Sequence, residues 1–302
     1  MAWDWESLVA PDGATTEGPA WDGAGLLFTS IGNSQIRRYD PATGAVTVVH
    51  RDTEESNGLA LDGAGNLYAC SHGRRAILRY DTAGRRTVLA DRFEGRRLNS
   101  PNDLALDRRG GIWFTDPRYG DDHADRELDH CSVYRIAPPA DGAGAWAIRR
   151  VTFDTTRPNG LLLSFDERTL YVAQSDYDRG AVRQFWAYAI DDDDTLGPRR
   201  VLHDFGPARG IDGMCWDTEG NIVATCGWEL SGPGPRIAVF APDGTVLEEH
   251  PVPAGRPTNC TFGGPDLTDL YVTTIGGHLY RVRNTGRRGY LRPPAVRPWL
   301  PA

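Results

Sequence analysis

Lysine is absent from this 302-residue sequence, and aspartate plus glutamate outnumber the basic residues by 41 to 33, which gives a net charge of −8. An acidic chain lacks the basic surface that nucleic acids and anionic membranes need, so we expect neither as a partner. No stretch approaches the roughly 18 consecutive apolar residues of a membrane helix. The N-terminus also has neither the basic start nor the apolar core of a signal peptide.

Cysteine is scarce, with five residues, an odd number, and no CxxC spacing. This usage is typical of reduced, mostly buried thiols in a cytosolic protein, so we expect a cytoplasmic location. A bridge between Cys215 and Cys226 is the alternative interpretation.

Amphipathic helical stretches are missing too, and a repeated motif takes their place. Each repeat has a polar residue, a short alternating strand, a Gly/Asp turn and a second apolar strand. The polar residues are Glu17, Asn57, Asn102, Asn159, Asp212 and Thr258. Their spacing is typical of β-propeller blades, and two further strand-like segments fit after each repeat. The sequence therefore predicts an all-β fold, a six-bladed propeller with four antiparallel strands per blade, as one domain over residues 1–302.

The sixth repeat supplies only three strands, at about residues 258–263, 269–274 and 277–283. The tail, residues 287–302, is rich in proline and makes a poor strand. Residues 3–9 are strand-like, so we expect them to provide the missing outer strand. This pairing would close the ring and leave no exposed sheet edge.

Propeller topology predicts which residues share the mouth of the central channel. The innermost strand of each blade starts at one end of the channel, where the six polar residues lie. Segments after each second strand overlook the same end, which makes His72, Arg118, Tyr119 and Trp228 candidate substrate contacts. The insertion 118–131 is either a lid over the pocket or a solvated loop.

The converging residues carry carboxylate and amide oxygens, with no arginine among the six. Carboxylates that meet in a narrow channel repel one another, so we expect a divalent cation to neutralise Glu17 and Asp212. Oxygen ligands favour Ca²⁺, with Mg²⁺, Mn²⁺ or Zn²⁺ as alternatives, although Zn²⁺ prefers His or Cys. Taken singly, Asn and Asp at these junctions are ordinary turn residues.

Two motifs, residues 97–104 (RLNSPNDL) and 113–120 (WFTDPRYG), carry a specific resemblance, supported by residues 17–19, 157–161 and 210–214. Over essentially the whole chain the sequence resembles the gluconolactonase / senescence-marker-protein (regucalcin) family of six-bladed propellers, and bacterial gluconolactonases most closely. The resemblance implies a divalent metal held by Glu17, Asn159 and Asp212, with Asn102 as a fourth ligand or substrate contact. Ser100 stands where some animal members carry an arginine that touches the sugar.

The expected activity is metal-dependent hydrolysis of a sugar lactone, with water as the nucleophile. The lactone is the expected small-molecule partner, and we expect the protein to be a monomer or weak homodimer. Asp212 is the expected general base or the group that orients the water, and Asn102 and Asn159 fix the substrate. Asp103 and Asn57 are expected behind these residues, with a second, structural ion as the alternative role of Asp103. Alternatives are a phosphotriesterase- or aryl-esterase-like hydrolase on the same site, or a non-catalytic propeller that binds proteins.

Overall fold

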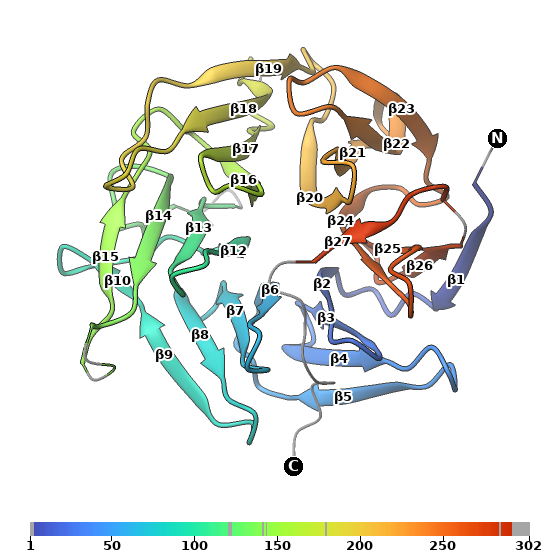
Figure 1. Cartoon of the computed structure of the whole chain (residues 1–302), viewed down its shortest axis with the longest axis horizontal. Helices are drawn as coiled ribbons and strands as arrows, with labels where there is room; N and C mark the ends of the chain where they lie inside the picture. The colour runs from blue at the N-terminus through green and yellow to red at the C-terminus, as the bar shows by residue number, and fades with distance from the viewer. Residues whose placement is uncertain are drawn as a thin grey trace.

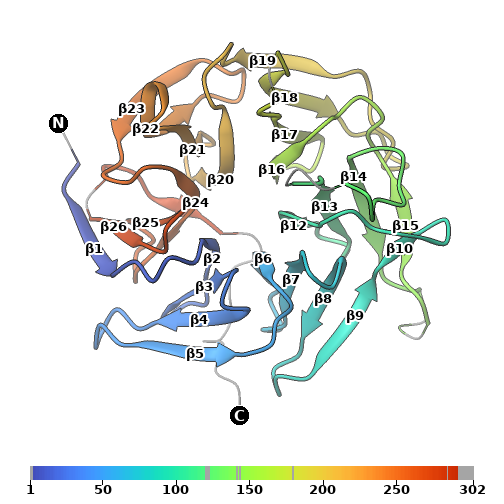
Figure 2. The same cartoon turned by 180° about the vertical axis from the view of Figure 1, so that it is seen from behind.

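The computed structural model describes residues 3–291 except 120–122, 141, 143, 179 and 284. Within these residues the chain forms strands and no helix, and so no helix that could cross a membrane. Six antiparallel sheets stand around a central axis as the blades of a propeller, as Figures 1 and 2 show from the two faces. The predicted six-bladed fold is therefore confirmed.

The blades are numbered in the chain order of their innermost strands, and the strands of each are given from the axis outward. Blade 1 contains β2 (Thr16–Trp21), β3 (Leu26–Ser30), β4 (Gln35–Tyr39) and β5 (Val46–His50). Blade 2 contains β6 (Ser56–Leu61), β7 (Leu67–Ser71), β8 (Ala76–Tyr80) and β9 (Arg86–Ala90). Blade 3 contains β12 (Leu104–Leu106), β13 (Ile112–Asp116), β14 (Ser132–Ala137) and β15 (Ala147–Arg150). A two-stranded hairpin, β10 (Arg92–Phe93) with β11 (Arg96–Arg97), lies between blades 2 and 3 along the chain.

The other three blades repeat this order. Blade 4 contains β16 (Pro158–Leu163), β17 (Thr169–Ser175), β18 (Arg183–Ala189) and β19 (Arg200–Asp204). Blade 5 contains β20 (Ile211–Asp217), β21 (Ile222–Trp228), β22 (Ser231–Phe240) and β23 (Val246–Pro251). Blade 6 contains β24 (Pro257–Gly263), β25 (Asp269–Thr274) and β26 (Leu279–Val282), with β1 (Trp5–Val9) as its outer strand.

The first strand closes the ring, as the sequence predicted. β1 pairs antiparallel with β26, with Trp5 opposite Val282. Glu6 also forms an ion pair with Arg281, with 2.7 Å between Glu6 Oε2 and Arg281 Nη2. The tail adds one pairing that the sequence did not predict: β27 (Gly289–Tyr290) pairs with the innermost strand β20 of blade 5. The rest of the tail, residues 292–302, lies outside the described residues.

Six apolar clusters hold the ring together, one between each pair of neighbouring blades. Successive side chains of a strand point to opposite faces, so one strand supplies two clusters. In β13, Trp113 packs toward blade 4 and Phe114 toward blade 2. The first strand of each repeat, described from the sequence as alternating, is buried at nearly every position, because a neighbouring blade covers each of its faces.

The turns between the first two strands of several blades depend on one aspartate. Asp22, Asp107 and Asp217 each end or follow the innermost strand, and their carboxylates accept backbone N–H groups of the turn. These carboxylates are buried, and each pairs with an arginine: Arg38, Arg135 and Arg287 respectively. The Gly/Asp turns of the repeat are therefore hydrogen-bonded Asx-turns that fix where each second strand begins.

All five cysteines are buried and unpaired. The alternative bridge between Cys215 and Cys226 is wrong, because Cys215 lies opposite Val223 and Cys226 opposite Ile211 on adjacent strands. The nearest thiol to Cys215 is Cys260 of the next blade, with 3.7 Å between the sulfur atoms.

Candidate active site

The six polar residues of the repeats are all buried, at one end of the innermost strands. Five of them are the second residue of their strand, and Asn102 stands two residues ahead of β12. The burial has a simple cause, since the first strand of every blade lines the channel and has neighbouring inner strands on both sides.

Close packing of the inner strands depends on the residue that follows each polar one. In blades 1, 2, 4 and 5 this residue is glycine. A Cβ on Gly18, which has φ +51°, would lie 2.3 Å from the carbonyl oxygen of Asn57, and one on Gly160 would lie 2.3 Å from that of Asp212. Only glycine allows backbones to approach this closely, and the approach brings the polar residues of adjacent blades together.

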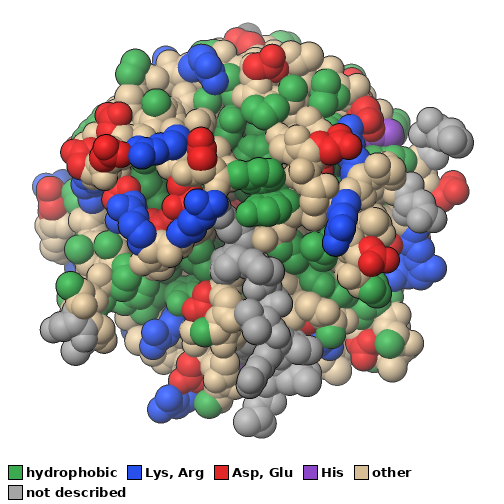
Figure 3. Space-filling model, viewed as in Figure 1, with side chains coloured by type: hydrophobic (Ala, Val, Ile, Leu, Met, Phe, Trp, Pro, Cys, Tyr) green, Lys and Arg blue, Asp and Glu red, His purple; other side chains and the backbone are tan. Residues whose placement is uncertain are grey.

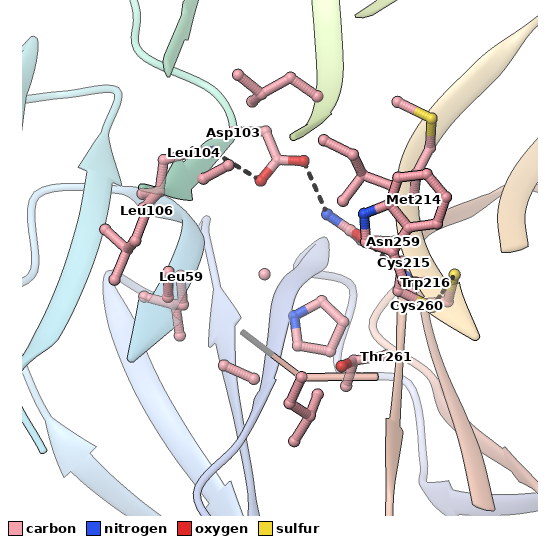
Figure 4. Close-up of a pocket in the computed structure, with 18 of the residues that line it drawn as sticks. Leu59, Asp103, Leu104, Leu106, Met214, Cys215, Trp216, Asn259, Cys260 and Thr261 are labelled. Carbon is pink, nitrogen blue, oxygen red and sulfur yellow. Dashed lines mark hydrogen bonds between the residues drawn. The ribbon is translucent and has the colours of Figure 1, made fainter. Parts of the chain in front are cut away.

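In blades 3 and 6 the same position holds Asp103 and Asn259 instead of glycine. Asn259 Nδ2 donates a hydrogen bond to Asp103 Oδ2 at 3.4 Å, although the two residues are 156 positions apart. The N–H of Leu104 donates to the other oxygen of Asp103 at 2.9 Å, and Asn259 Oδ1 accepts from the N–H of Cys260 at 2.8 Å. This pair, here called the crossbar, spans the channel from blade 3 to blade 6 (Figure 4).

An apolar cavity of about 160 Å³ lies next to the crossbar, on the side away from the polar residues. Its lining includes Leu59, Leu104, Leu106, Met214 and Trp216 from the inner strands (Figure 4). Figure 3 shows hydrophobic side chains gathered near the centre of the face on which β27 lies. The channel therefore has a polar end and an apolar end, and chemistry that needs charge belongs to the polar end.

Negative charge is concentrated at the polar end. Burial, followed by repulsion from Asp212 and Asp103, raises the pKa of Glu17 well above its usual range. The N–H of Gly18, 2.7 Å from Glu17 Oε2, opposes this rise in pKa. Burial also raises the pKa of Asp103 to about 7. Carboxylates in this arrangement stabilise a bound cation, because its charge removes their mutual repulsion.

The amide side chains of Asn102 and Asn159 are buried, and neither forms a hydrogen bond to another described residue. Their oxygens are free to act as ligands to a hard cation. Among the described residues no group of three His, Cys, Asp or Glu side chains is arranged to hold a metal ion. A cation at this position would therefore need the amide oxygens as well as Glu17 and Asp212.

One carboxylate of the site already has a positive partner. Arg209 Nη2 donates to Asp212 Oδ2 at 2.5 Å, in a contact that is almost fully buried. The six polar positions hold no arginine, as the sequence shows, but arginine reaches the site from just outside them. Arg157, Arg209 and Arg256 stand two or three residues before the polar residues of blades 4, 5 and 6. This recurring arginine is the signal in the sequence for a positive side of the site.

His72 and Asn57 form a pair at the edge of the site. The two side chains are 2.9 Å apart, between Asn57 Nδ2 and His72 Nε2. Burial, followed by the charge of Arg118, lowers the pKa of His72 to about 4. His72 is consequently neutral near pH 7, and its Nε2 accepts the hydrogen bond from Asn57. This bond positions Asn57 without engaging its own amide oxygen, which is buried and unpartnered.

The other candidate contacts lie around the same mouth. Arg118 contacts Asp125 of the 118–131 insertion, and residues 120–122 of that insertion lie outside the described residues. Tyr119 stacks on Tyr177, with ring centroids 5.9 Å apart. Trp228 is 37% exposed and lines a separate hollow of about 280 Å³ nearer the rim. Arg118 therefore lies near His72, and Tyr119 lies near Asp212. Trp228 lies further from the centre of the site.

The two resemblance motifs pack against each other and hold Asn102 in place. Asp116 ends β13 and is buried, and its carboxylate accepts the N–H groups of Asn99 and Ser100 at 2.8 and 2.7 Å. Asn99 Nδ2 donates in turn to the carbonyl of His130 at 2.9 Å. These bonds fix the loop that leads into Asn102, so the second motif positions the first.

Comparison with known proteins agrees with this architecture. The family model described as SMP-30/Gluconolactonase/LRE-like region matches residues 15–276. The gluconolactonase of Zymomonas mobilis subsp. mobilis is 33% identical over 91% of this chain and 80% of its own length. Pentonolactonase XacC of Haloferax volcanii is 28% identical over 86% of this chain and 81% of its own length. The solved structure of XC5397 from Xanthomonas campestris, a gluconolactonase, has a TM-score of 0.78 and 35% identity, and covers 93% of this chain and 89% of its own.

Proposed function

We propose, from the premise that this chain belongs to the SMP-30/gluconolactonase/LRE-like family, that it is a metal-dependent lactonase acting on a sugar lactone. The observation that carries the proposal is the meeting of two buried carboxylates, Glu17 and Asp212, with two unpartnered amides at the polar end of the channel. Two of the relatives are a gluconolactonase and a pentonolactonase, which supports a sugar lactone as the substrate.

The residues that would hold the metal are Glu17, Asn159 and Asp212, with Asn102 as a fourth ligand or a substrate contact. All of their donor atoms are oxygens, which favours Ca²⁺, with Mg²⁺ or Mn²⁺ next. When bound, such a cation supplies a Lewis acid for the lactone carbonyl oxygen. Asp103 lies behind Glu17 and contributes charge to the site from the crossbar.

Asp212 is the proposed general base. Arg209 holds its Oδ2, while its Oδ1 has no hydrogen-bond partner among the described residues. The Oδ1 atom accepts a proton from water as the water oxygen attacks the carbonyl carbon. The ring C–O bond then breaks, and the proton passes to the ring oxygen, which becomes the hydroxyl of the open-chain acid. Arg209 keeps Asp212 oriented through this exchange.

The substrate contacts are proposed from their position around the mouth. Asn102 and Asn159 orient the reacting ester group, while His72, Arg118 and Tyr119 meet the hydroxyl groups of the sugar. Trp228, nearer the rim, is proposed to contact only the outer part of the substrate. The five unpaired thiols support a cytoplasmic location, and we propose that the protein acts as a monomer or weak homodimer.

The test combines metal analysis with lactone turnover. Purified protein is stripped of metal and assayed by proton release on glucono-1,5-lactone and pentonolactones, with the spontaneous rate subtracted. Activity should disappear on stripping and return with Ca²⁺, Mg²⁺ or Mn²⁺. Turnover that survives metal removal would overturn the mechanism. Higher rates on a phosphotriester or an aryl ester than on every lactone would favour the related hydrolase, and no rate on any of them would favour a binding protein.

A further inference from the structure

Three arginines gather on one side of the mouth. Arg157, Arg209 and Arg256 stand just before the innermost strands β16, β20 and β24, so three consecutive blades each contribute one arginine. All three lie within electrostatic reach of Tyr177. Arg157 and Arg209 are only 6% and 8% exposed, and Arg256 is partly buried. Three positive groups in such surroundings need negative partners, because burying a charge without one is costly.

Two of the three have such partners. Arg157 Nη1 lies 3.2 Å from Asp176 Oδ1 and 3.3 Å from Asp178 Oδ1, and Arg209 is bonded to Asp212. The third, Arg256, forms no ion pair and no side-chain hydrogen bond with any described residue, and its Nε is buried without a partner. Glu229 lines the same rim hollow as Arg256 but forms no ion pair with it.

Arg256 has a second arginine near it and, among the described residues, no carboxylate in contact. Burial, followed by the charge of Arg209, lowers the pKa of Arg256, and the charge of Asp212, which is already paired with Arg209, opposes this change. Arg209 Nε and the hydroxyl of Tyr119 are also buried without partners. The ring of Tyr177 stacks on Tyr119 and lies under the Arg157 guanidinium, with 4.3 Å from Arg157 Cζ to the ring centroid. Arg157 is thus occupied, and the unused donors belong to Arg256, Arg209 and Tyr119.

We propose that these unused donors bind an anionic group on the substrate, so that the preferred lactone is an acidic one, carrying a carboxylate or a phosphate away from its ring carbonyl. The inference rests on the proposed function for the identity of the substrate as a lactone. Arg256 lies within electrostatic reach of both Arg209 and Tyr119, and Arg209 within reach of Tyr119. An oxyanion bound among these three side chains would accept charged hydrogen bonds, which are strong. Arg209 then joins the two ends of the substrate site, since its Nη2 holds Asp212.

The experiment compares lactones that differ only in the charged group. One pair is glucono-1,5-lactone and its 6-phosphate; the other is glucono-1,4-lactone and glucaro-1,4-lactone, which carries a carboxylate at the far end. We expect the wild-type protein to prefer the charged member of at least one pair by tenfold or more in kcat/KM. The pair that shows the preference tells phosphate from carboxylate.

Arg256→Gln and Arg256→Lys identify the residue responsible. Arg256→Gln should lower the preference for the charged lactone at least tenfold, mainly through KM, and Arg256→Lys should restore part of it. Arg85→Gln, which removes an exposed arginine of blade 2, is the matched control and should change neither rate. Equal losses on charged and neutral lactones in Arg256→Gln would show a structural role and overturn the proposal.

A binding measurement separates this proposal from the proposed function. Titration calorimetry with 6-phosphogluconate and glucarate, with gluconate as reference, reports the anion site without turnover. Hydrolysis of neutral lactones with no preference and no Arg256-dependent binding would overturn the anion site and leave the lactonase standing. Arg256-dependent binding without hydrolysis of any lactone would support the anion site and overturn the lactonase.

Discussion

Asn259 reaches across the channel from blade 6 and donates a hydrogen bond to Asp103 of blade 3, at 3.4 Å. The pair lies between the polar end of the channel and the apolar cavity, and Asn259 also opposes the rise in the pKa of Glu17. The crossbar therefore gives the candidate site a polar floor, and it links two blades that no sheet pairing connects.

Removing the crossbar should destabilise the protein. Asn259→Ala takes away the donor to Asp103 and leaves a carboxylate in the channel without its side-chain partner. We expect the free energy of unfolding to fall by about 1–3 kcal/mol, measured by urea denaturation. Asn33→Ala, which removes an exposed asparagine of blade 1, should stay within about 0.5 kcal/mol of wild type. An equal, small change in both variants would mean that the crossbar adds no stability.

The two carboxylates of the proposed metal site should be required for both metal and activity. Glu17→Gln and Asp212→Asn keep the shape of each side chain and remove its charge, so we expect bound metal to be lost and kcat/KM to fall at least about a hundredfold. Metal content and lactone turnover are measured on the same preparations. Asp193→Asn is the control, because Asp193 is exposed in the acidic turn 191–194, between the outer strands β18 and β19. Full activity in either site variant would contradict the assignment.

Gly160 should tolerate no side chain. The Cβ of Gly160→Ala would meet the Asp212 carbonyl oxygen at 2.3 Å, so blade 4 or blade 5 has to shift. We expect a loss of about 1–3 kcal/mol in the free energy of unfolding and a lower lactone turnover, because Asp212 moves with its backbone. Gly197→Ala, whose Cβ would lie at an ordinary 3.6 Å from the Ala189 Cβ, is the control for the exchange itself. Equal stability and turnover in the two variants would show that the strands adjust freely.

His72 should make stability depend on pH on the acidic side. Its pKa is about 4 in the folded protein against 6.5 as the ordinary value, so the unfolded state binds more protons between these pH values. The contribution of neutral His72 is fully present above pH 6.5 and is lost as the pH falls toward 4. His72→Gln should reduce the slope of unfolding free energy against pH by up to about 1.4 kcal/mol per unit, measured by urea denaturation between pH 6.5 and 5.

The control for this prediction is His123→Gln, because His123 is an exposed histidine of the 118–131 insertion. It should leave the slope as in wild type. If His72→Gln also leaves the slope unchanged, His72 takes up its proton in the folded protein as readily as in the unfolded chain.

Most of the fold could be predicted from the sequence, because turns and strands depend mainly on residues that are close together in the chain. The Gly/Asp turns identified the repeats, and the shortage of one strand in the last repeat identified residues 3–9 as the closing strand. The β27 pairing was missed, because two residues in a proline-rich tail give no alternation to detect.

The site was predicted less completely, for a different reason. Spacing along the chain identifies which backbone positions share the mouth, and Glu17 and Asp212 follow from it. It does not show how far a long side chain reaches, so the contact of Arg209 with Asp212 was missed. The partner of Asp103 could not be found either, because Asn259 lies 156 positions away on the opposite blade and occupies a position that is glycine in four of the blades.

The pairing of β1 with β26 limits when blade 6 can fold during synthesis of the chain. β1 leaves the ribosome early, but the residues that it pairs with follow much later; Glu6 and its partner Arg281 are 275 positions apart. Until β26 has been made, β1 has no partner and the growing ring has an open edge, a condition that favours association with other chains. Folding of the last blade therefore waits until residues 279–282 have been made.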